Sequence, residues 1–133
     1  MSAIVIDTHV LIWYLFEPEK LSFLARDTIE TTLDFAHPVY IPAISIVEII
    51  YLMEKGRISF TTLTALQQVL NDEQFSFVIA PLDEYVAFAL QHIDRQAIPD
   101  MPDRIIAATA LARHLSLVTC DEKICSYKLH TIW

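Results

Sequence analysis

Residues 3–13 of the chain read AIVIDTHVLIW. The β-branched residues Ile4 to Ile6 predict a short buried strand, and the apolar run Val10–Trp13 predicts the helix that follows it. Asp7 stands between the two, at the carboxyl end of the strand. Parallel α/β sheets bind ligands beyond the carboxyl ends of their strands. Asp7 is therefore a candidate functional residue, although it can equally serve as the N-cap of the next helix.

The alternation of strand and helix patterns continues to the end of the chain. Five short apolar runs predict strands, at Ala3–Ile6, Val39–Ile41, Phe77–Ile79, Leu117–Thr119 and His130–Ile132. Six helical patterns lie between them, at His9–Phe16, Phe23–Phe35, Ser45–Lys55, Thr62–Asp72, Glu84–Ile93 and Asp103–His114. Together they predict an α/β fold with a mainly parallel, five-stranded central sheet flanked by helices. Ser22 and Asp83 are predicted N-caps, and Gly56 is predicted to end a helix.

Length and composition favour one domain that spans residues 1–133. Hydrophobic residues make up 54% of the chain, yet its longest apolar run, Val10–Phe16, is far shorter than the roughly 20 residues of a membrane span. No basic segment precedes the first apolar run, so we expect no secretory signal and a cytoplasmic location. Cys120 and Cys125 are the only cysteines, and we expect both to be reduced thiols. A single glycine excludes a glycine-rich phosphate loop.

Glu48 lies inside the segment Ile44–Met53, which is apolar on nearly every side of the predicted helix. Burying an unpaired carboxylate is unfavourable, so an acid in such a helix needs a partner or a cation. An alternative is a capping box, because Ser45 and Glu48 have the S-x-x-E spacing. The apolar surface itself indicates either a core position or an interface, and the first helix leaves the same two alternatives open.

Asp103 begins the next acidic motif and shares a helix face with the apolar residues Ile106 and Ala107. Asp100 precedes it by three residues and is a candidate cap, with Pro102 in the first turn. We assign the structural role to Asp100 and the functional role to Asp103, and the reverse assignment stays open.

Asp121 follows the strand pattern Leu117–Thr119 and so falls at another carboxyl end, although it also suits a turn or cap. At one edge of a parallel sheet, the four acids Asp7, Glu48, Asp103 and Asp121 can converge. Clustered carboxylates repel one another, and a hard divalent cation such as Mg²⁺ or Mn²⁺ relieves that repulsion.

Five segments carry a family resemblance: IDT (6–8) with Leu11, ISIVEI (44–49), DMPDRIIAA (100–108), LVTCDEKI (117–124) and the terminal TIW (131–133). In their order and separation they resemble the PIN domain, and within it the VapC-type toxins of toxin–antitoxin modules. The chain departs from that pattern in two places. It has DMPDR where the family commonly has D-P-x-D-R, and it has Cys120 where relatives often carry a basic residue, which removes one phosphate contact.

The resemblance implies a Mg²⁺- or Mn²⁺-dependent endoribonuclease, with RNA as substrate and water as the nucleophile. It carries the acidic metal site onto Asp7, Glu48, Asp103 and Asp121, with Asp7 and Asp103 as the main ligands. It assigns Thr119 and Asp100 to supporting roles. The implied partners are a second copy of the chain, forming a homodimer, and a cognate antitoxin; no membrane partner is expected.

The net charge of −8 argues against nucleic-acid binding, which normally uses a basic surface. Bound cations would offset the acids of the site, and we expect Arg104 and Lys123 to supply local contacts to RNA. His9 lies near Asp7 in the sequence, but a structural or surface role is favoured for it.

Two other functions fit parts of the pattern. The first is a non-catalytic module of the same fold whose acidic pocket binds only a protein, and metal titration separates it from a nuclease. The second is a receiver-like phospho-acceptor domain. That reading needs adjacent acids after the first strand, whereas Ile6 precedes Asp7 here.

Overall fold

The computed structural model describes residues 2–133 and contains a five-stranded sheet in the order β3-β2-β1-β4-β5, in which every neighbouring pair is parallel. The strands are β1 (Ile4–Ile6), β2 (Val39–Pro42), β3 (Phe77–Ala80), β4 (Ser116–Val118) and β5 (Thr131–Ile132). The α-helices are α1 (Thr8–Phe16), α2 (Phe23–Asp34), α3 (Ala43–Glu54), α4 (Thr61–Asn71), α5 (Glu84–Ala89), α6 (Met101–Arg113) and α7 (Glu122–Cys125). Two 3₁₀ helices are η1 (Pro18–Lys20) and η2 (Leu90–His92). The predicted α/β fold and its parallel sheet are confirmed.

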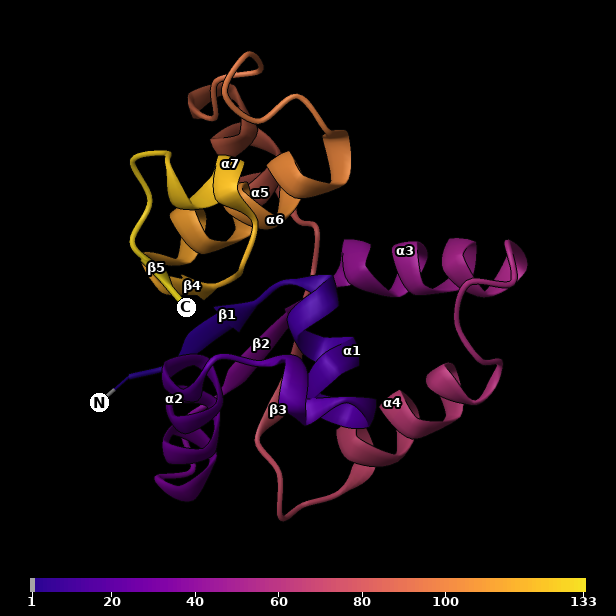
Figure 1. The fold of residues 1–133 in the computed structure, drawn as a ribbon. Helices are drawn as coiled ribbons and strands as arrows, with labels where there is room; N and C mark the ends of the chain where they lie inside the picture. Colours follow the sequence, from indigo (N-terminus) through magenta and orange to yellow (C-terminus); the bar gives the residue numbers. More distant parts are fainter. Residues whose placement is uncertain (1) are drawn as a thin grey trace.

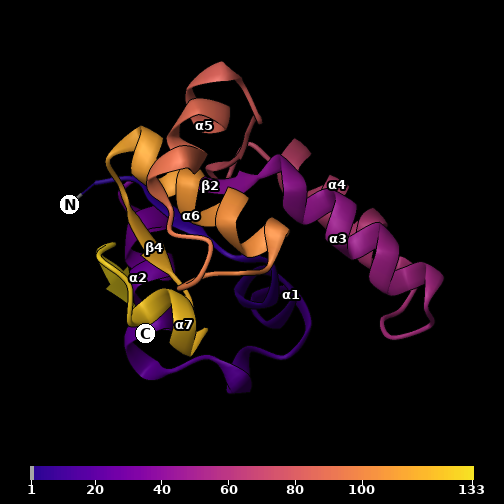
Figure 2. The same cartoon turned by 90° about the horizontal axis from the view of Figure 1, so that it is seen from above.

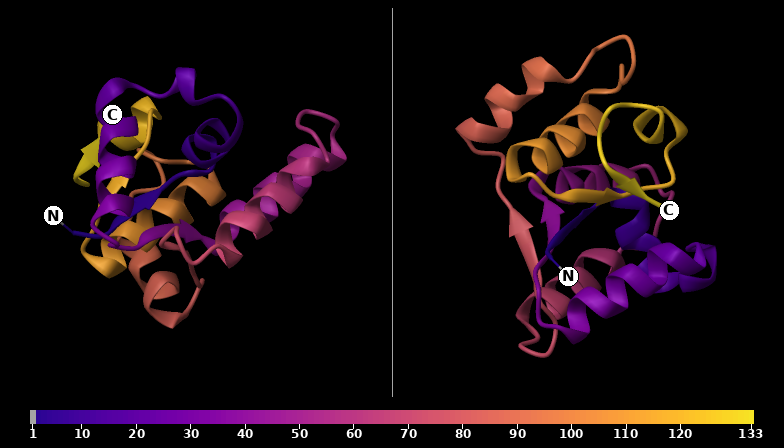
Figure 3. Two further views of the ribbon diagram at one scale, coloured as in Figure 1. Left: turned by 90° about the horizontal axis from the view of Figure 1, so that it is seen from below. Right: turned by 90° about the vertical axis from the view of Figure 1, so that its left-hand side faces the viewer.

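Strand β1 lies at the centre of the sheet and shows how the two faces are filled. Ile4 and Ile6 belong to a core shared with α1, α2, α3 and α4, whereas Val5 belongs to a second core shared with α5, α6 and α7. Figure 1 shows α5, α6 and α7 on one side of the sheet and α1, α2 and α4 on the other, and the right-hand view of Figure 3 shows the same layers edge-on. Because successive side chains point to opposite faces, a strand buried on both faces is apolar throughout.

Helices α3 and α4 extend together beyond the edge of the sheet (Figure 2). On α3, Ile49 and Met53 are buried, while Val47 is 46% exposed and Tyr51 is 60% exposed. The apolar surface predicted for this helix is therefore real on one of its faces. Helix α1 differs, because Val10, Leu11 and Ile12 are buried, so its apolar run belongs to the core.

The helix ends follow local sequence signals in most places. Ser22 and Asp83 accept hydrogen bonds from the backbone amides of Ala25 and Val86, which confirms both as N-caps. Gly56 has φ of +70° after the last residues of α3, in agreement with its predicted role. No helix among residues 2–133 has the length and apolar character needed to cross a membrane.

Three local details differ from the predictions. The capping box, which was the alternative interpretation of Ser45 and Glu48, is absent, because α3 begins at Ala43 and Ser45 is buried inside the helix. Helix α6 begins at Met101 rather than Asp103, because Asp100 provides the cap. Helix α7 was missed, since its four residues are too few to show a helical period.

Candidate metal centre

Carboxylates from separate parts of the chain line one cavity of about 530 Å³. The cavity lies where β1 and β4 end and where α1, α6 and α7 begin. Its acidic lining residues are Asp7, Glu48, Asp100, Asp103 and Asp121, and we call it the acidic pocket. Parallel strands place their carboxyl ends at one edge, which explains why residues more than a hundred positions apart meet here.

Asp7 is the most buried acid of the pocket, with 7% of its surface exposed. It is the N-cap of α1, and its Oδ1 accepts a hydrogen bond of 2.9 Å from the amide of Val10. Its Oδ2 accepts a hydrogen bond from the hydroxyl of Thr119. Burial raises the pKa of Asp7, and the Thr119 hydroxyl opposes that rise. The capping and functional interpretations of Asp7 are therefore compatible, because one carboxylate occupies both positions.

Glu48 projects from α3 into the pocket and is held by the first residue of α1. The hydroxyl of Thr8 lies 2.5 Å from Glu48 Oε1 and 2.8 Å from the hydroxyl of Ser45. Burial raises the pKa of Glu48, the Thr8 hydrogen bond lowers it, and the charge of Asp100 raises it further. Ser45 thus supports the acid through Thr8 rather than by capping the helix.

Asp100 and Asp103 occupy the start of α6. Asp100 is the N-cap, and its Oδ2 accepts a hydrogen bond of 3.3 Å from the amide of Asp103. Partial burial and then the negative charges of Asp100, Asp121 and the other pocket acids raise the pKa of Asp103 to about 7. An acid with this pKa is present in both its charged and its neutral form near neutral pH, as expected for a partly buried member of a carboxylate cluster.

Asp121 caps α7, and its Oδ1 accepts hydrogen bonds from the amides of Lys123 and Ile124. The amide of Asp121 itself donates to the hydroxyl oxygen of Thr119 at 3.1 Å. Thr119 is fully buried and therefore connects Asp121 with Asp7. The structure thus places all four candidate ligands, and both candidate supporting residues, in or against one pocket.

The donor set fits a hard divalent cation in its chemistry, because every acidic ligand offers oxygen. The side chains nevertheless stand apart around the pocket. Within residues 2–133, no group of three or more His, Cys, Asp or Glu side chains is already arranged to hold an ion. Burial and the neighbouring negative charges disfavour the charged form of Asp103, and a bound cation would relieve both effects.

Of the two residues predicted to contact RNA, Arg104 does not reach the acidic pocket. Its guanidinium donates to the backbone carbonyls of Leu90 and Ile93, at 3.2 Å and 2.9 Å, so it ties α6 to the segment around η2 and does not line the acidic pocket. The helical position next to Asp103 turns Arg104 to another side of α6. Lys123 is exposed and lines a small cavity beside the acidic pocket with Asp100, Asp103 and Asp121.

Two aromatic residues line the pocket in addition to the predicted acids; His9 had been weighed for the site, and Trp13 was missed. His9 and Trp13 both line it, and their ring centroids are 5.9 Å apart. The sequence does contain the signal, because the two residues are four apart on the helix that follows Asp7 and so lie on one face. His9 is exposed, as the predicted surface role requires, but it lies at the rim of the pocket.

Comparison with known proteins gives consistent matches over the whole chain. The family model of the PIN domain matches residues 4–128. The chain is 34% identical over 131 residues to Ribonuclease VapC22 of Mycobacterium tuberculosis, covering 96% of this chain and 94% of that protein. It is similar in structure to VapBC2 from Rickettsia felis bound to a promoter DNA fragment, with a TM-score of 0.74, 15% identity and coverage of 98% and 97% of the two chains. A toxin–antitoxin complex from Klebsiella pneumoniae is similar with a TM-score of 0.62, 20% identity and coverage of 98% and 96%.

Proposed function

This chain belongs to the PIN-domain family, and on that premise we propose that it is a divalent-metal-dependent endoribonuclease, the toxin of a toxin–antitoxin pair. We propose further that residues 1–133 act as a single nuclease domain in the cytoplasm. The similarity to a ribonuclease along nearly the full length of both proteins supports the activity. The observation that carries the proposal is the acidic pocket itself, in which burial and then the neighbouring carboxylates raise the pKa of Asp103 to about 7.

The proposed ligands of one Mg²⁺ or Mn²⁺ ion are Asp7 and Asp103, with Asp121 and Glu48 completing the shell directly or through water. A bound ion of this kind supplies Lewis-acid polarisation of the phosphodiester and activation of water for attack. The rest of the chemistry belongs to the chain. Thr119 and the Val10 amide fix the Asp7 carboxylate, Thr8 fixes Glu48, and none of these residues has to act as a nucleophile.

The positive ends of three helices face the pocket. The amides at the starts of α1, α6 and α7 donate to Asp7, Asp100 and Asp121. Helix N-termini favour negative charge through their dipoles and unpaired amides. They hold these carboxylates in fixed orientations around the pocket.

The proposed protein partners are a second copy of the chain and an antitoxin. Complexes of toxin with antitoxin among the structurally similar proteins support this proposal. An antitoxin that places a basic side chain in the acidic pocket would relieve the same repulsion as a metal ion.

Cleavage of labelled single-stranded RNA with Mg²⁺ or Mn²⁺ tests the activity. We expect the wild type to cut, EDTA to stop the reaction, and Asp7→Asn and Asp103→Asn each to reduce the rate by a large factor. Asp27→Asn is the matched control, since Asp27 is an exposed acid on α2 outside the pocket. Equal rates for wild type and Asp7→Asn, or activity that survives EDTA, would rule out the mechanism.

The rival is a non-catalytic module whose pocket binds a protein only. Isothermal titration with Mn²⁺ separates the two functions. A nuclease binds the ion through the pocket acids and loses binding in Asp103→Asn, whereas a protein-only module shows no metal binding that depends on Asp103.

A further inference from the structure

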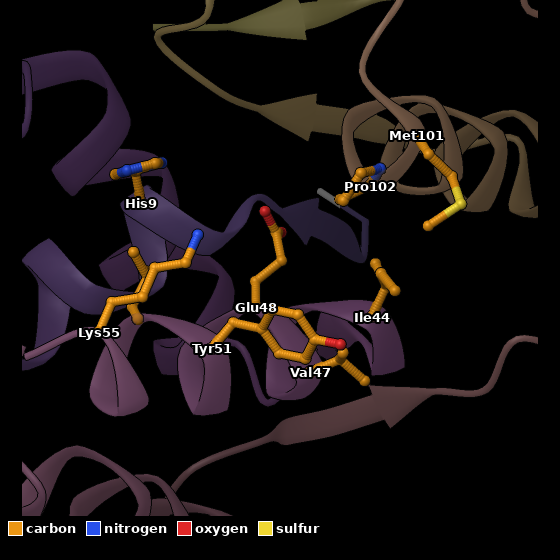
Figure 4. Close-up of a pocket in the computed structure, with 9 residues that line it drawn as sticks. His9, Ile44, Val47, Glu48, Tyr51, Lys55, Met101 and Pro102 are labelled. Carbon is orange, nitrogen blue, oxygen red and sulfur yellow. The ribbon is translucent and has the colours of Figure 1, made fainter. Parts of the chain in front are cut away.

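A second cavity of about 300 Å³ lies beside the acidic pocket, along one face of α3 (Figure 4). Glu48, Tyr51 and Lys55 follow one another at helical spacing, so their side chains form a stripe on this face. Met101, at the start of α6, forms part of the opposite wall. We call this space the α3 cavity.

The α3 cavity adjoins the acidic pocket, because Glu48 and His9 line both. A third small cavity adjoins the acidic pocket through Asp100, Asp103 and Asp121, and Lys123 lines it. The α3 cavity and this third cavity have no lining residue in common. The acidic pocket therefore has two separate extensions, one toward α3 and one toward α7.

The positive charges are distributed along the same line. No lysine or arginine lines the acidic pocket, whereas Lys55 lines the α3 cavity and Lys123 lines the extension toward α7. Across the described part of the chain, neither lysine takes part in an ion pair. Figure 4 shows that the Lys55 and Glu48 side chains extend from α3 in the same direction. The protein has a net charge of −8, yet a lysine without an ion pair lies on each side of the acidic pocket. Two such lysines can bind successive phosphates of a polyanion that crosses the pocket.

The walls of the α3 cavity suit a flat apolar ring. Tyr51 is 60% exposed and Met101 is 61% exposed, so both side chains present accessible apolar surface at the cavity. Bases of single-stranded RNA stack on aromatic side chains, and the backbone beside each base is contacted by lysine or arginine. An aromatic ring, a thioether and a lysine in one cavity provide both kinds of contact.

From this arrangement, and resting on the proposed ribonuclease function, we propose that the α3 cavity is a nucleotide subsite for unpaired RNA. Tyr51 and Met101 hold the base of a nucleotide that flanks the scissile phosphate, and Lys55 contacts its backbone phosphate. A phosphodiester in the acidic pocket carries a nucleoside on each side, so one neighbour enters the α3 cavity and the other passes Lys123. The substrate is therefore unpaired at this nucleotide, because a paired base would first have to be extruded from its helix at a cost in free energy.

The test measures binding of a short, fluorescently labelled single-stranded RNA of mixed sequence, with hydrolysis-resistant phosphorothioate linkages, to the full wild-type chain over a series of salt concentrations with Mn²⁺ present. Under these conditions, Tyr51→Ala weakens binding roughly tenfold, as expected for the loss of one stacked base, and Tyr51→Phe does not. Lys55→Gln reduces the slope of log affinity against log salt by roughly 0.7, the value for one phosphate contact on a single strand. The same RNA in a duplex shows no dependence on Tyr51.

Two matched controls lie far from the pocket. Tyr85 is 71% exposed on α5, and Lys128 lines a separate cavity near β5, so Tyr85→Ala and Lys128→Gln leave RNA binding unchanged. If Tyr51→Ala and Lys55→Gln behave as these controls do, or if the parent protein does not bind the strand, the subsite is refuted. The subsite is also refuted if Tyr51→Ala converts a dimer into a monomer in sedimentation while RNA binding is unchanged. Cleavage by the wild type is scored separately, so loss of the nuclease function is distinguished from loss of the subsite.

Discussion

The hydroxyl of Thr119 donates a hydrogen bond to the carboxylate of Asp7, although the two residues are 112 positions apart in the sequence. The same hydroxyl oxygen accepts a hydrogen bond from the backbone amide of Asp121. One buried side chain thus sets the positions of two acids that come from opposite ends of the chain. Substitutions at Thr119 should consequently affect both folding and the acidic pocket.

We expect Thr119→Val to lower the free energy of unfolding by about 1–3 kcal/mol, because it leaves buried polar groups without a partner. It should also reduce RNA cleavage, whereas Thr119→Ser should retain both properties. Urea unfolding and a cleavage assay measure the two effects. Thr109→Val is the control, since that hydroxyl bonds only to the carbonyl of Ile105 in its own helix. Identical behaviour of the two valine variants would contradict the role assigned to Thr119.

The raised pKa of Asp103 makes the stability of the metal-free protein depend on pH. Folding raises the pKa from 3.8 to about 7, so this residue favours the folded state below the lower value. That contribution is lost as the pH rises through the folded-state pKa. In EDTA, the urea midpoint should therefore fall between about pH 4 and about pH 7. Asp103→Asn should flatten this fall and Asp27→Asn should not; a slope unaffected by Asp103→Asn would show that other groups cause it.

Divalent cations should stabilise the folded protein, because they bind the gathered carboxylates and not the unfolded chain. At a concentration 100 times the dissociation constant, the expected gain is about 2.7 kcal/mol. Differential scanning fluorimetry with Mg²⁺ or Mn²⁺ measures it as a rise in Tm. Asp7→Asn and Asp103→Asn should lose this rise while Asp27→Asn keeps it. A rise of equal size in all these variants would place ion binding outside the acidic pocket.

Arg104 should matter for stability and not for RNA binding. Its guanidinium bonds to two backbone carbonyls, and its Nε is buried without a partner. We expect Arg104→Gln to lower the free energy of unfolding by about 2 kcal/mol, the loss of hydrogen bonds from a charged group. In the fraction that folds, KM for RNA and its salt dependence should match the wild type. If Arg104→Gln reduces the slope of log affinity against log salt as much as Lys55→Gln is expected to, Arg104 contacts a phosphate after all.

Much of the fold could be predicted from the sequence because its signals are local. The strand in front of Asp7 is apolar on both faces, and Ser22, Asp83 and Gly56 mark helix ends by well-defined chemistry. Helix α7 has only four residues, and it gives no periodic pattern. Asp121 caps it, but a possible cap without a periodic pattern after it does not predict a helix.

The sequence indicated which acids lie in the acidic pocket, but not the side-chain contacts that hold them there. An acid at the end of a parallel strand lies at a known edge, so Asp7 and Asp121 could be placed there from sequence. The contacts of Thr8 with Glu48, and the turning of Arg104 away from the pocket, depend on how helices pack against each other. The exposed stripe containing Tyr51 and Lys55 lies in the same apolar helix as Glu48, and the sequence alone left core and interface positions undistinguished.

Three of the pocket acids, Asp7, Asp100 and Asp121, are also the residues at which helices start. Substitutions at these positions therefore abolish activity in two ways, which differ in whether the helix cap is kept. Exchange for asparagine keeps an oxygen for the helix amides and removes the charge, so the product is a full-length decoy that still occupies its partners. Exchange for alanine removes both, and the weakened chain is exposed to cellular proteases. A genetic selection for harmless alleles should recover both kinds, and immunoblotting would separate the abundant decoys from the degraded chains.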